Sequence, residues 1–151
     1  MSEDLDNELA EIGENLRTQD NRITQDPAFC VQVLERIGPM APGHTGNTMF
    51  YDIDNGIVHY SDDSDNSRWH ELMAVYKAGD DLPDGIEAGD YCERWHTVQT
   101  CFTEAGCKRY LGLDGHNLRH YSGVRIYAES FHRNPEMLAI RKALMETGGL
   151  K

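Results

Sequence analysis

The spacing of apolar residues changes along the chain, and that change constrains the fold more than any other feature. Near the N-terminus, apolar residues recur every three or four positions, which places them on one stripe of an α-helix. This stripe consists of Leu5, Leu9, Ile12 and Leu16. The middle of the chain alternates apolar and polar residues, which is the period of a half-buried strand. After residue 102 the pattern predicts a helix, a strand and a second helix.

Several segments bounded by turn-forming residues are predicted to form strands. They are residues 28–37, the two arms of a hairpin within 48–60, residues 91–102 and residues 124–130. Asn55-Gly56 supplies the hairpin turn, because both residue types accept the positive φ that such a turn requires. Segment 68–79 fits a short helix or a strand, and its pattern does not decide between them.

Capping residues predict where a helix over 104–113 begins and ends. Thr103 is a favourable N-cap, since its hydroxyl can accept from a free amide of the first turn. Phe102 before that cap and Cys107 in the first turns fit a hydrophobic staple. Gly115 stands where a left-handed residue often ends a helix.

A last helix is predicted over 135–148. Asn134 is its N-cap and Pro135 takes the first helical position, which proline favours because its missing N–H is not needed there. Its core side is expected to consist of Met137, Ile140 and Leu144, and the helix should stop at Gly148-Gly149.

The element order predicts an α+β fold with an N-terminal helix, a mostly antiparallel sheet and two C-terminal helices separated by a strand. A chain of 151 residues is long enough to bury a core and is expected to form a single domain over 1–151. Flexible acidic connections are expected near 61–67 and 79–90, where Asp, Ser and Gly are frequent.

The charge of the chain is −12 and is distributed unevenly. Residues 1–100 hold 21 Asp and Glu against six Lys and Arg, whereas residues 101–151 hold five against eight. This excess of acid argues against a general nucleic-acid binder, which needs a surplus of basic residues at phosphates. No apolar run approaches the roughly 20 residues that span a membrane, and the acidic N-terminus is unlike a signal peptide. A cytoplasmic protein with four reduced cysteines is therefore expected.

Two stretches, "DNRITQDPAFCVQV" and "CFTEAGCKRYLGLDGHNL…RIYAESFHRNPEM", carry a resemblance. They are similar to a mostly uncharacterised family of small proteins encoded by tailed bacteriophages and prophages of Gram-negative bacteria. The similarity extends over about the first 37 residues and over 94–145, with Asp114 where the family usually has Asn. The resemblance implies a setting, the cytoplasm of a bacterial host, and assigns no catalytic residue.

Two charged sets are candidate binding surfaces. The basic set surrounds the strand at 124–130, with aromatic residues between its members, and consists of Arg119, His120, Arg125 and Arg133. Arg beside aromatic residues is typical of protein interfaces and of surfaces that bind nucleotides or single strands. In the alternative interpretation, these residues pair with acids from the first half of the chain. The acidic set lies in the two connections and consists of Asp62, Asp63, Asp65, Asp80, Asp81 and Asp84.

A zinc site is the alternative interpretation of four residues, Cys101, Cys107, His116 and His120. Two thiolates and two imidazoles suit tetrahedral zinc, but the spacing differs from that of the common zinc motifs. Cys107 also has a structural explanation as part of the staple. We therefore expect no metal and no cofactor, and we find no arrangement of nucleophile and base that predicts an enzyme.

These observations favour a phage or prophage accessory protein that acts by binding. The leading hypothesis is that it modulates or inhibits a host protein complex, such as a defence complex, through a charged surface. The alternative is a nucleic-acid or nucleotide-binding module that uses the basic C-terminal face, with or without zinc. No membrane partner is expected.

Overall fold

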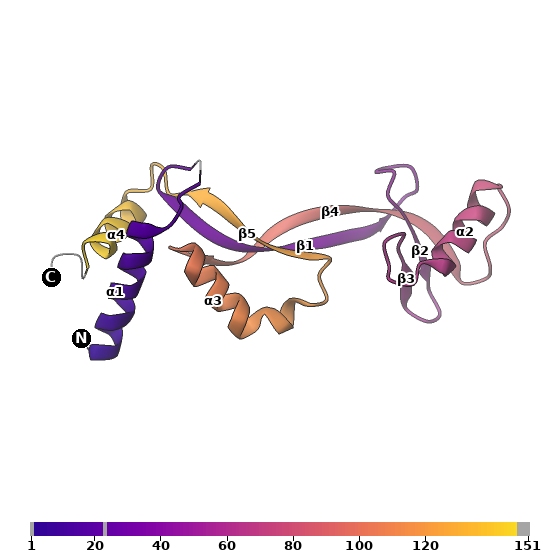
Figure 1. Ribbon diagram of the computed structural model, residues 1–151. Coiled ribbons are helices and arrows are strands. Elements are labelled where there is room, and N and C mark those ends of the chain that lie inside the picture. The colour runs from indigo at the N-terminus through magenta and orange to yellow at the C-terminus, as the bar shows by residue number, and fades with distance from the viewer. Residues whose placement is uncertain (1, 23, 148–151) are drawn as a thin grey trace. The chain divides into compact units, whose positions relative to one another are not determined.

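The computed structural model describes residues 2–22 and 24–147 (Figure 1). Its elements, in chain order, are α1 (Glu3–Thr18), β1 (Pro27–Met40), β2 (Thr48–Asp52), β3 (Ile57–His59), α2 (Ser67–Lys77), β4 (Ile86–Cys101), α3 (Glu104–Asp114), the 3-10 helix η1 (Gly115–Leu118), β5 (Gly123–Ser130) and α4 (Pro135–Glu146). The chain divides into two compact units. Unit 1 comprises Met1–Glu35 and Trp95–Lys151, and unit 2 comprises Arg36–Arg94.

The strands are hydrogen-bonded in the order β3-β2-β4-β1-β5. β1 pairs with β5, and β2 pairs with both β3 and β4, in each case antiparallel. The α+β class, the antiparallel sheet and the N-terminal helix are thereby confirmed. A single domain over 1–151 stays a prediction, and so does the flexibility of its acidic connections.

α1 begins as its sequence suggests, because the Ser2 hydroxyl accepts from the amide of Leu5 at 3.3 Å. The acidic first turn lies at the positive end of the helix dipole. The apolar stripe is buried only toward its C-terminal end, where Leu16 is in the core and Leu5 remains 45% exposed. The first turns of α1 are therefore exposed and carry acidic side chains.

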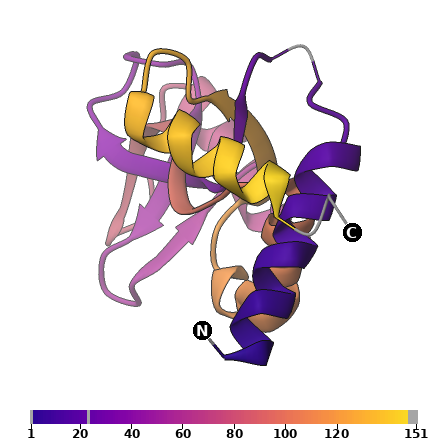
Figure 2. The same cartoon turned by 90° about the vertical axis from the view of Figure 1, so that its left-hand side faces the viewer.

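α1 and α4 lie side by side in unit 1 (Figures 1 and 2). The helices touch closely at Gly13, where an added Cβ would lie 2.2 Å from the carbonyl oxygen of Leu144. Arg17 caps the end of α4, since its Nη1 donates to the carbonyl oxygens of Met145 at 2.6 Å and Thr147 at 3.0 Å. The close contact thus depends on one glycine and one arginine.

α4 begins at the predicted cap, because Asn134 Oδ1 accepts from the amide of Met137 at 3.2 Å. Its predicted core side is wrong at Ile140, which is 48% exposed. Arg141 is buried instead and pairs with Asp26 at 3.5 Å. Leu144 is buried as predicted, so the buried side of α4 contains Arg141 in place of Ile140. The predicted stop at Gly148-Gly149 lies outside the described residues.

The core of unit 1 forms where one face of the sheet meets α3 and η1. β1 contributes Phe29, Val31 and Val33, which pack with Cys107 and Leu118. The opposite face of β1 is also covered, since Gln32 is buried and donates to the hydroxyl of Thr97 at 3.2 Å. β1 is a strand as predicted, but in unit 1 it is buried on both faces rather than on one.

Unit 2 contains the predicted hairpin, with β2 paired to β3 in register from Phe50 opposite His59 to Asp52 opposite Ile57. The undecided segment 68–79 forms most of α2. That helix packs on β2 because Phe50 makes edge-to-face ring contacts with Trp69 and Tyr76 at centroid distances of 6.2 and 5.9 Å. Segment 68–79 is therefore helical in a place where it makes tertiary contacts with β2.

The acidic connection predicted over 79–90 is shorter than expected, because β4 already begins at Ile86 and pairs with β2. Asp90, at the end of that range, is buried rather than solvated. Its carboxylate accepts from the amides of Thr45 at 2.9 Å and Gly46 at 3.1 Å. These hydrogen bonds, that of Thr45 first, hold the pKa of Asp90 below its usual range.

The low pKa of Asp90 predicts that acid releases the loop at 43–46. A carboxyl group whose folded pKa is depressed stabilises the fold above its unfolded value of about 3.9 and loses that contribution as the pH falls through the folded pKa. We expect the amide resonances of Thr45 and Gly46 to titrate together below about pH 3.9 in an NMR titration. Asp90→Asn should remove this titration, and a midpoint above that pH in the unchanged protein would contradict the prediction.

Candidate functional site

A groove with a volume of about 420 Å³ is lined by residues of α1, of α3 and of the segment just before α3 in unit 1. Its lining is mostly apolar in the interior and charged along the rim. The lining residues are Glu8, Glu11, Ile12, Asn15, Cys101, Phe102, Thr103, Ala105, Gly106, Arg109, Tyr110 and Leu113. None of the residues of the predicted basic and acidic sets is among them, whereas Cys101 of the zinc set is, and the groove was not predicted from the sequence.

The start of α3 is fixed to the end of α1 by polar contacts. Thr103 is the N-cap, as predicted, and its hydroxyl accepts from the amide of Gly106 at 2.9 Å. The amide of Glu104 donates to Oε1 of Gln19 at 3.1 Å, and the Glu104 carboxylate pairs with Arg22. The two walls of the groove are therefore joined at one end.

α3 does not end at Gly115 in the predicted way. Gly115 has φ −58°, so its backbone is right-handed helical rather than left-handed. The chain continues directly into η1, and Leu118 of that turn enters the core of unit 1.

The open end of the groove exposes apolar surface on α3. Leu113 is 71% exposed, the largest exposure among the large apolar side chains of the described residues. Tyr110 is half-buried in the wall, and its hydroxyl donates to Asp114 at 2.8 Å. That hydrogen bond raises the pKa of Tyr110. The groove thus has an apolar surface with a fixed polar edge.

The rim of the groove is acidic. Glu8 and Glu11 project from α1, and the only basic residue of the lining is Arg109. Arg109 is already paired, since its Nη1 lies 2.6 Å from Oε1 of Glu8. Because α1 also carries acids outside the groove, at Glu3 and Asp4, the field at this surface favours a positively charged ligand.

The two cysteines near the groove, Cys101 and Cys107, differ in their exposure. Cys107 is fully buried in the core of unit 1, and burial, with Cys101 nearby, raises its pKa to about 12. Such a thiol stays protonated at neutral pH and is a poor nucleophile and a poor metal ligand. Cys101 is half-buried and lines the groove.

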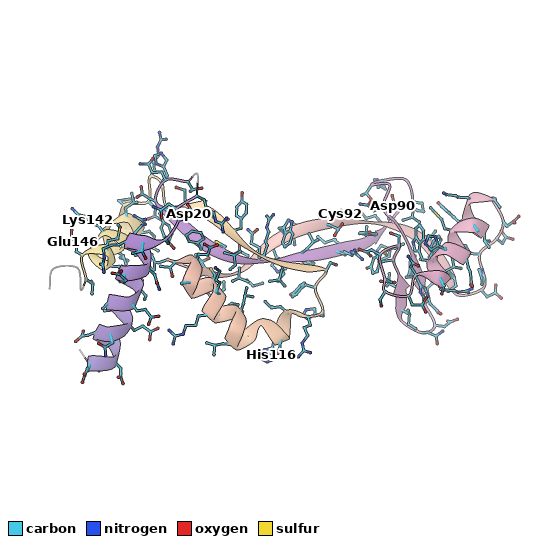
Figure 3. The ribbon with its side chains drawn as sticks, viewed as in Figure 1. Asp20, Asp90, Cys92, His116, Lys142 and Glu146 are labelled. Atoms are coloured by element: carbon cyan, nitrogen blue, oxygen red, sulfur yellow. The ribbon has the colours of Figure 1, made fainter. Side chains whose placement is uncertain are left out.

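The zinc set is not brought together. His116 is exposed and points outward from η1 (Figure 3), and His120 stacks on Tyr121 with ring centroids 4.1 Å apart. Within residues 2–22 and 24–147, no three His, Cys, Asp or Glu side chains are placed to hold a metal ion. The turn formed by η1 separates the histidines from the buried thiol of Cys107, which the spacing along the chain could not reveal.

Arg125, from the predicted basic set, lies on the face of the sheet opposite the core. Its guanidinium carbon is 4.2 Å from the ring centre of Trp95 and 4.6 Å from that of Tyr127. Its Nε donates to Oε1 of Gln32 at 2.9 Å. Arg125 therefore stabilises the sheet surface by cation–π contacts, a role that fits the structural alternative more than a free phosphate-binding residue.

The remaining basic residues lie at opposite ends of β5. Arg119 and His120 precede the strand, and Arg133 follows it in the turn before α4. At about 3.3 Å per residue, the strand separates these ends by roughly 25 Å. Arg119 and Arg133 thus do not form one compact patch, although each is exposed.

The acidic set belongs to unit 2, and part of it has internal partners. Asp62 pairs with Arg36, which lowers the pKa of Asp62. Asp63 accepts from the amide of Tyr60 at 2.8 Å, and Asp65 accepts from the hydroxyl of Ser67 at 2.7 Å. These three aspartates therefore shape the turn between β3 and α2. The other three, Asp80, Asp81 and Asp84, are exposed between α2 and β4.

No family model, no curated protein and no solved structure matches the chain. Within the described part of the chain, no helix has the length and apolar character needed to cross a lipid bilayer. A function for this chain is therefore inferred from the geometry of the groove and of the sheet edges.

Proposed function

We propose that this protein acts by binding another protein and that the groove between α1 and α3 receives an amphipathic helix of the partner. The observation that supports this most directly is an apolar groove, ending at the exposed Leu113, beneath an acidic rim. A helix placed in such a groove contributes apolar side chains at positions i, i+3 or i+4, and i+7.

Charge complementarity specifies the kind of helix. Glu8 and Glu11 lie along one side, and the positive charge of Arg109 is engaged by Glu8. A partner helix with Lys or Arg beside its apolar stripe would place a cation against the carboxylate of Glu11, since that of Glu8 is paired with Arg109. An acidic helix would be repelled, because like charges across an interface oppose association.

The biological setting in this proposal is that of a phage or prophage accessory protein, which modulates or inhibits a host protein complex. The resemblance of "CFTEAGCKRYLGLDGHNL" and "RIYAESFHRNPEM" to phage and prophage proteins supports the setting. The partner is then a bacterial host protein with a basic amphipathic helix. The exposed aspartates Asp80, Asp81 and Asp84 are a separate candidate binding surface on unit 2.

The test is capture of partners from a nuclease-treated lysate of a Gram-negative bacterium, with Leu113→Asp as the groove variant. Leu113 is so exposed that its replacement should leave folding intact. Ile140→Asp is the matched control, since it also replaces an exposed aliphatic residue by aspartate, but on α4. We expect the unchanged protein and Ile140→Asp to capture the same partner protein. Leu113→Asp should capture at least about tenfold less of that partner.

Labelling of Cys101 provides a second readout of groove occupancy. The captured partner, or its basic helix as a peptide, should slow alkylation of Cys101 but not of Cys92, which lies in unit 2 outside the groove. Equal capture by Leu113→Asp together with unprotected Cys101 would overturn the proposal. Recovery of nucleic acid alone, lost after nuclease treatment, would favour the nucleic-acid alternative instead.

A further inference from the structure

We propose that β5 is an interface between two copies of this chain, which pair antiparallel through their β5 strands in a register centred on Tyr127. This inference is separate from the proposed function, because the groove is formed by α1 and α3 and not by β5. It rests on three observations, namely the free edge, the lack of edge protection and the match of side chains in one register.

β5 is an edge strand, bonded on one side only to β1. The pairing extends over all eight residues, from Gly123 opposite Leu34 to Ser130 opposite Pro27. Among the described residues, no backbone or side-chain hydrogen bond from elsewhere reaches the peptide groups of 123–130. Its outward N–H and C=O groups are therefore available to another strand.

At the other end of the strand order, β3 is too short to be a comparable edge, since it has only three residues. β5 contains no proline, no lysine and no bulge, which are three of the devices that prevent edge pairing, and its charged residues are Arg125 and Glu129. Its sequence is GVRIYAES, and its pairing with β1 advances residue for residue without interruption. Val124 and Tyr127 remain 42% and 44% exposed. A long, regular and partly apolar edge of this kind favours association.

The geometry of an antiparallel ladder limits the possible registers. Along β5, the N–H and C=O groups of every second residue point away from β1. In an antiparallel pair, a residue of this kind must lie opposite a residue of the same kind in the second copy. Every symmetric register is consequently centred on a single residue. The central candidates are Ile126, Tyr127 and Ala128.

The register centred on Tyr127 places opposite charges across from each other. It places Arg125 opposite Glu129 of the second copy, and by symmetry Glu129 opposite Arg125, so that two cross-strand ion pairs form. The two Tyr127 rings face each other on the two-fold axis. On the other face, Ile126 lies opposite Ala128, next to the core of unit 1 that both side chains already contact.

The neighbouring registers lack this match. Centring on Ile126 places Arg125 opposite Tyr127 and Glu129 opposite Gly123, whereas centring on Ala128 places Tyr127 opposite Glu129. Arg125 retains its Nη groups for the ion pair, because its Nε makes the bond to Gln32 and the face of its guanidinium lies over Trp95 and Tyr127. Glu129 accepts from the Cys30 thiol through Oε2 at 3.5 Å, so its Oε1 remains for the pair. Roughly six to eight main-chain hydrogen bonds would join the strands.

The first test is the mass of the protein in solution as a function of concentration, measured by light scattering. We expect a monomer–dimer equilibrium between 17.1 kDa and twice that mass. Glu129→Arg should weaken dimerisation at least about tenfold, because two arginines then face each other at both ends of the ladder. The swapped variant Arg125→Glu with Glu129→Arg restores the pairing and should recover most of the affinity.

The second test is a register-specific cross-link. Tyr127→Cys places one thiol of each copy at the two-fold axis, and mild oxidation should join the two chains in high yield. Glu129→Cys is the matched control, since its two thiols would lie about 13 Å apart, four residues along the strands. Cross-linking above the level of the unchanged protein only for Tyr127→Cys is expected. A monomer at every soluble concentration, or a dimer that Glu129→Arg does not weaken, would overturn the proposal.

Discussion

Gly13→Ala is expected to destabilise the protein by about 2 kcal/mol, although alanine is the better helix former. The added methyl would lie 2.2 Å from the carbonyl oxygen of Leu144 and 2.9 Å from that of Thr147. Both are backbone atoms at the end of α4, so the two helices must separate. Overpacking of this kind costs about 3 kcal/mol at the upper end of its usual range, which exceeds the roughly 1 kcal/mol gained in helix propensity.

Gly112→Ala is the matched control. Gly112 lies within α3, and an added Cβ would meet nothing within 4 Å. The same substitution should therefore stabilise the protein by about 0.5–1 kcal/mol, because only the propensity gain remains. Urea unfolding of both variants gives the comparison directly. A Gly13→Ala protein as stable as the unchanged protein would show that α1 and α4 do not approach each other as described.

Phe29→Ala should have the largest effect on stability, a loss of about 4 kcal/mol. Phe29 is completely buried in the core of unit 1, and a ring removed from such a site loses its transfer free energy and leaves a cavity. Since single domains are stable by only about 5–15 kcal/mol, the variant should unfold at much lower denaturant concentration. Ile140→Ala serves as the control and should change stability by no more than about 0.5 kcal/mol.

The comparison of Phe29 with Ile140 also tests the orientation of α4. Ile140 belonged to the predicted core side of that helix, whereas the structure leaves it half exposed and buries Arg141. If Ile140→Ala cost as much as a core substitution, the predicted orientation would be right and the described one wrong. Thermal unfolding measured for both variants under one condition separates these outcomes.

Features that depend on a few neighbouring residues could be predicted from the sequence. Thr103 and Asn134 cap their helices where expected, and Asn55-Gly56 lies in the turn of the expected hairpin. Each feature is decided by hydrogen bonds and backbone preferences within a few residues. Segment 68–79 remained undecided because its helical form is accompanied by contacts of Trp69 and Tyr76 with Phe50, which is distant along the chain.

The candidate site could not be predicted in the same way. The groove needs α1 and α3 beside each other, a placement to which Gln19, Arg22 and Glu104 contribute across more than 80 residues of sequence. The predicted basic set was gathered by proximity along the chain, yet β5 places its members at opposite ends. Arg125 was correctly seen among aromatic residues, but its partner Trp95 comes from another strand.

Periodicity, capping and charge are local properties, so the sequence alone predicts most of the order of helices and strands, the N-caps Thr103 and Asn134 and the acidic character of α1. Segment 68–79 and the end of α3 at Gly115 are the exceptions. The tertiary structure decided which side of α4 is buried, where the groove opens and which strand is left at the edge. These depend on close packing and on pairing between distant segments, as at Gly13 against Leu144 and in the one-sided pairing of β5 with β1. Such contacts are selected by shape and by buried polar partners, and neither is encoded in the spacing of residues along one segment.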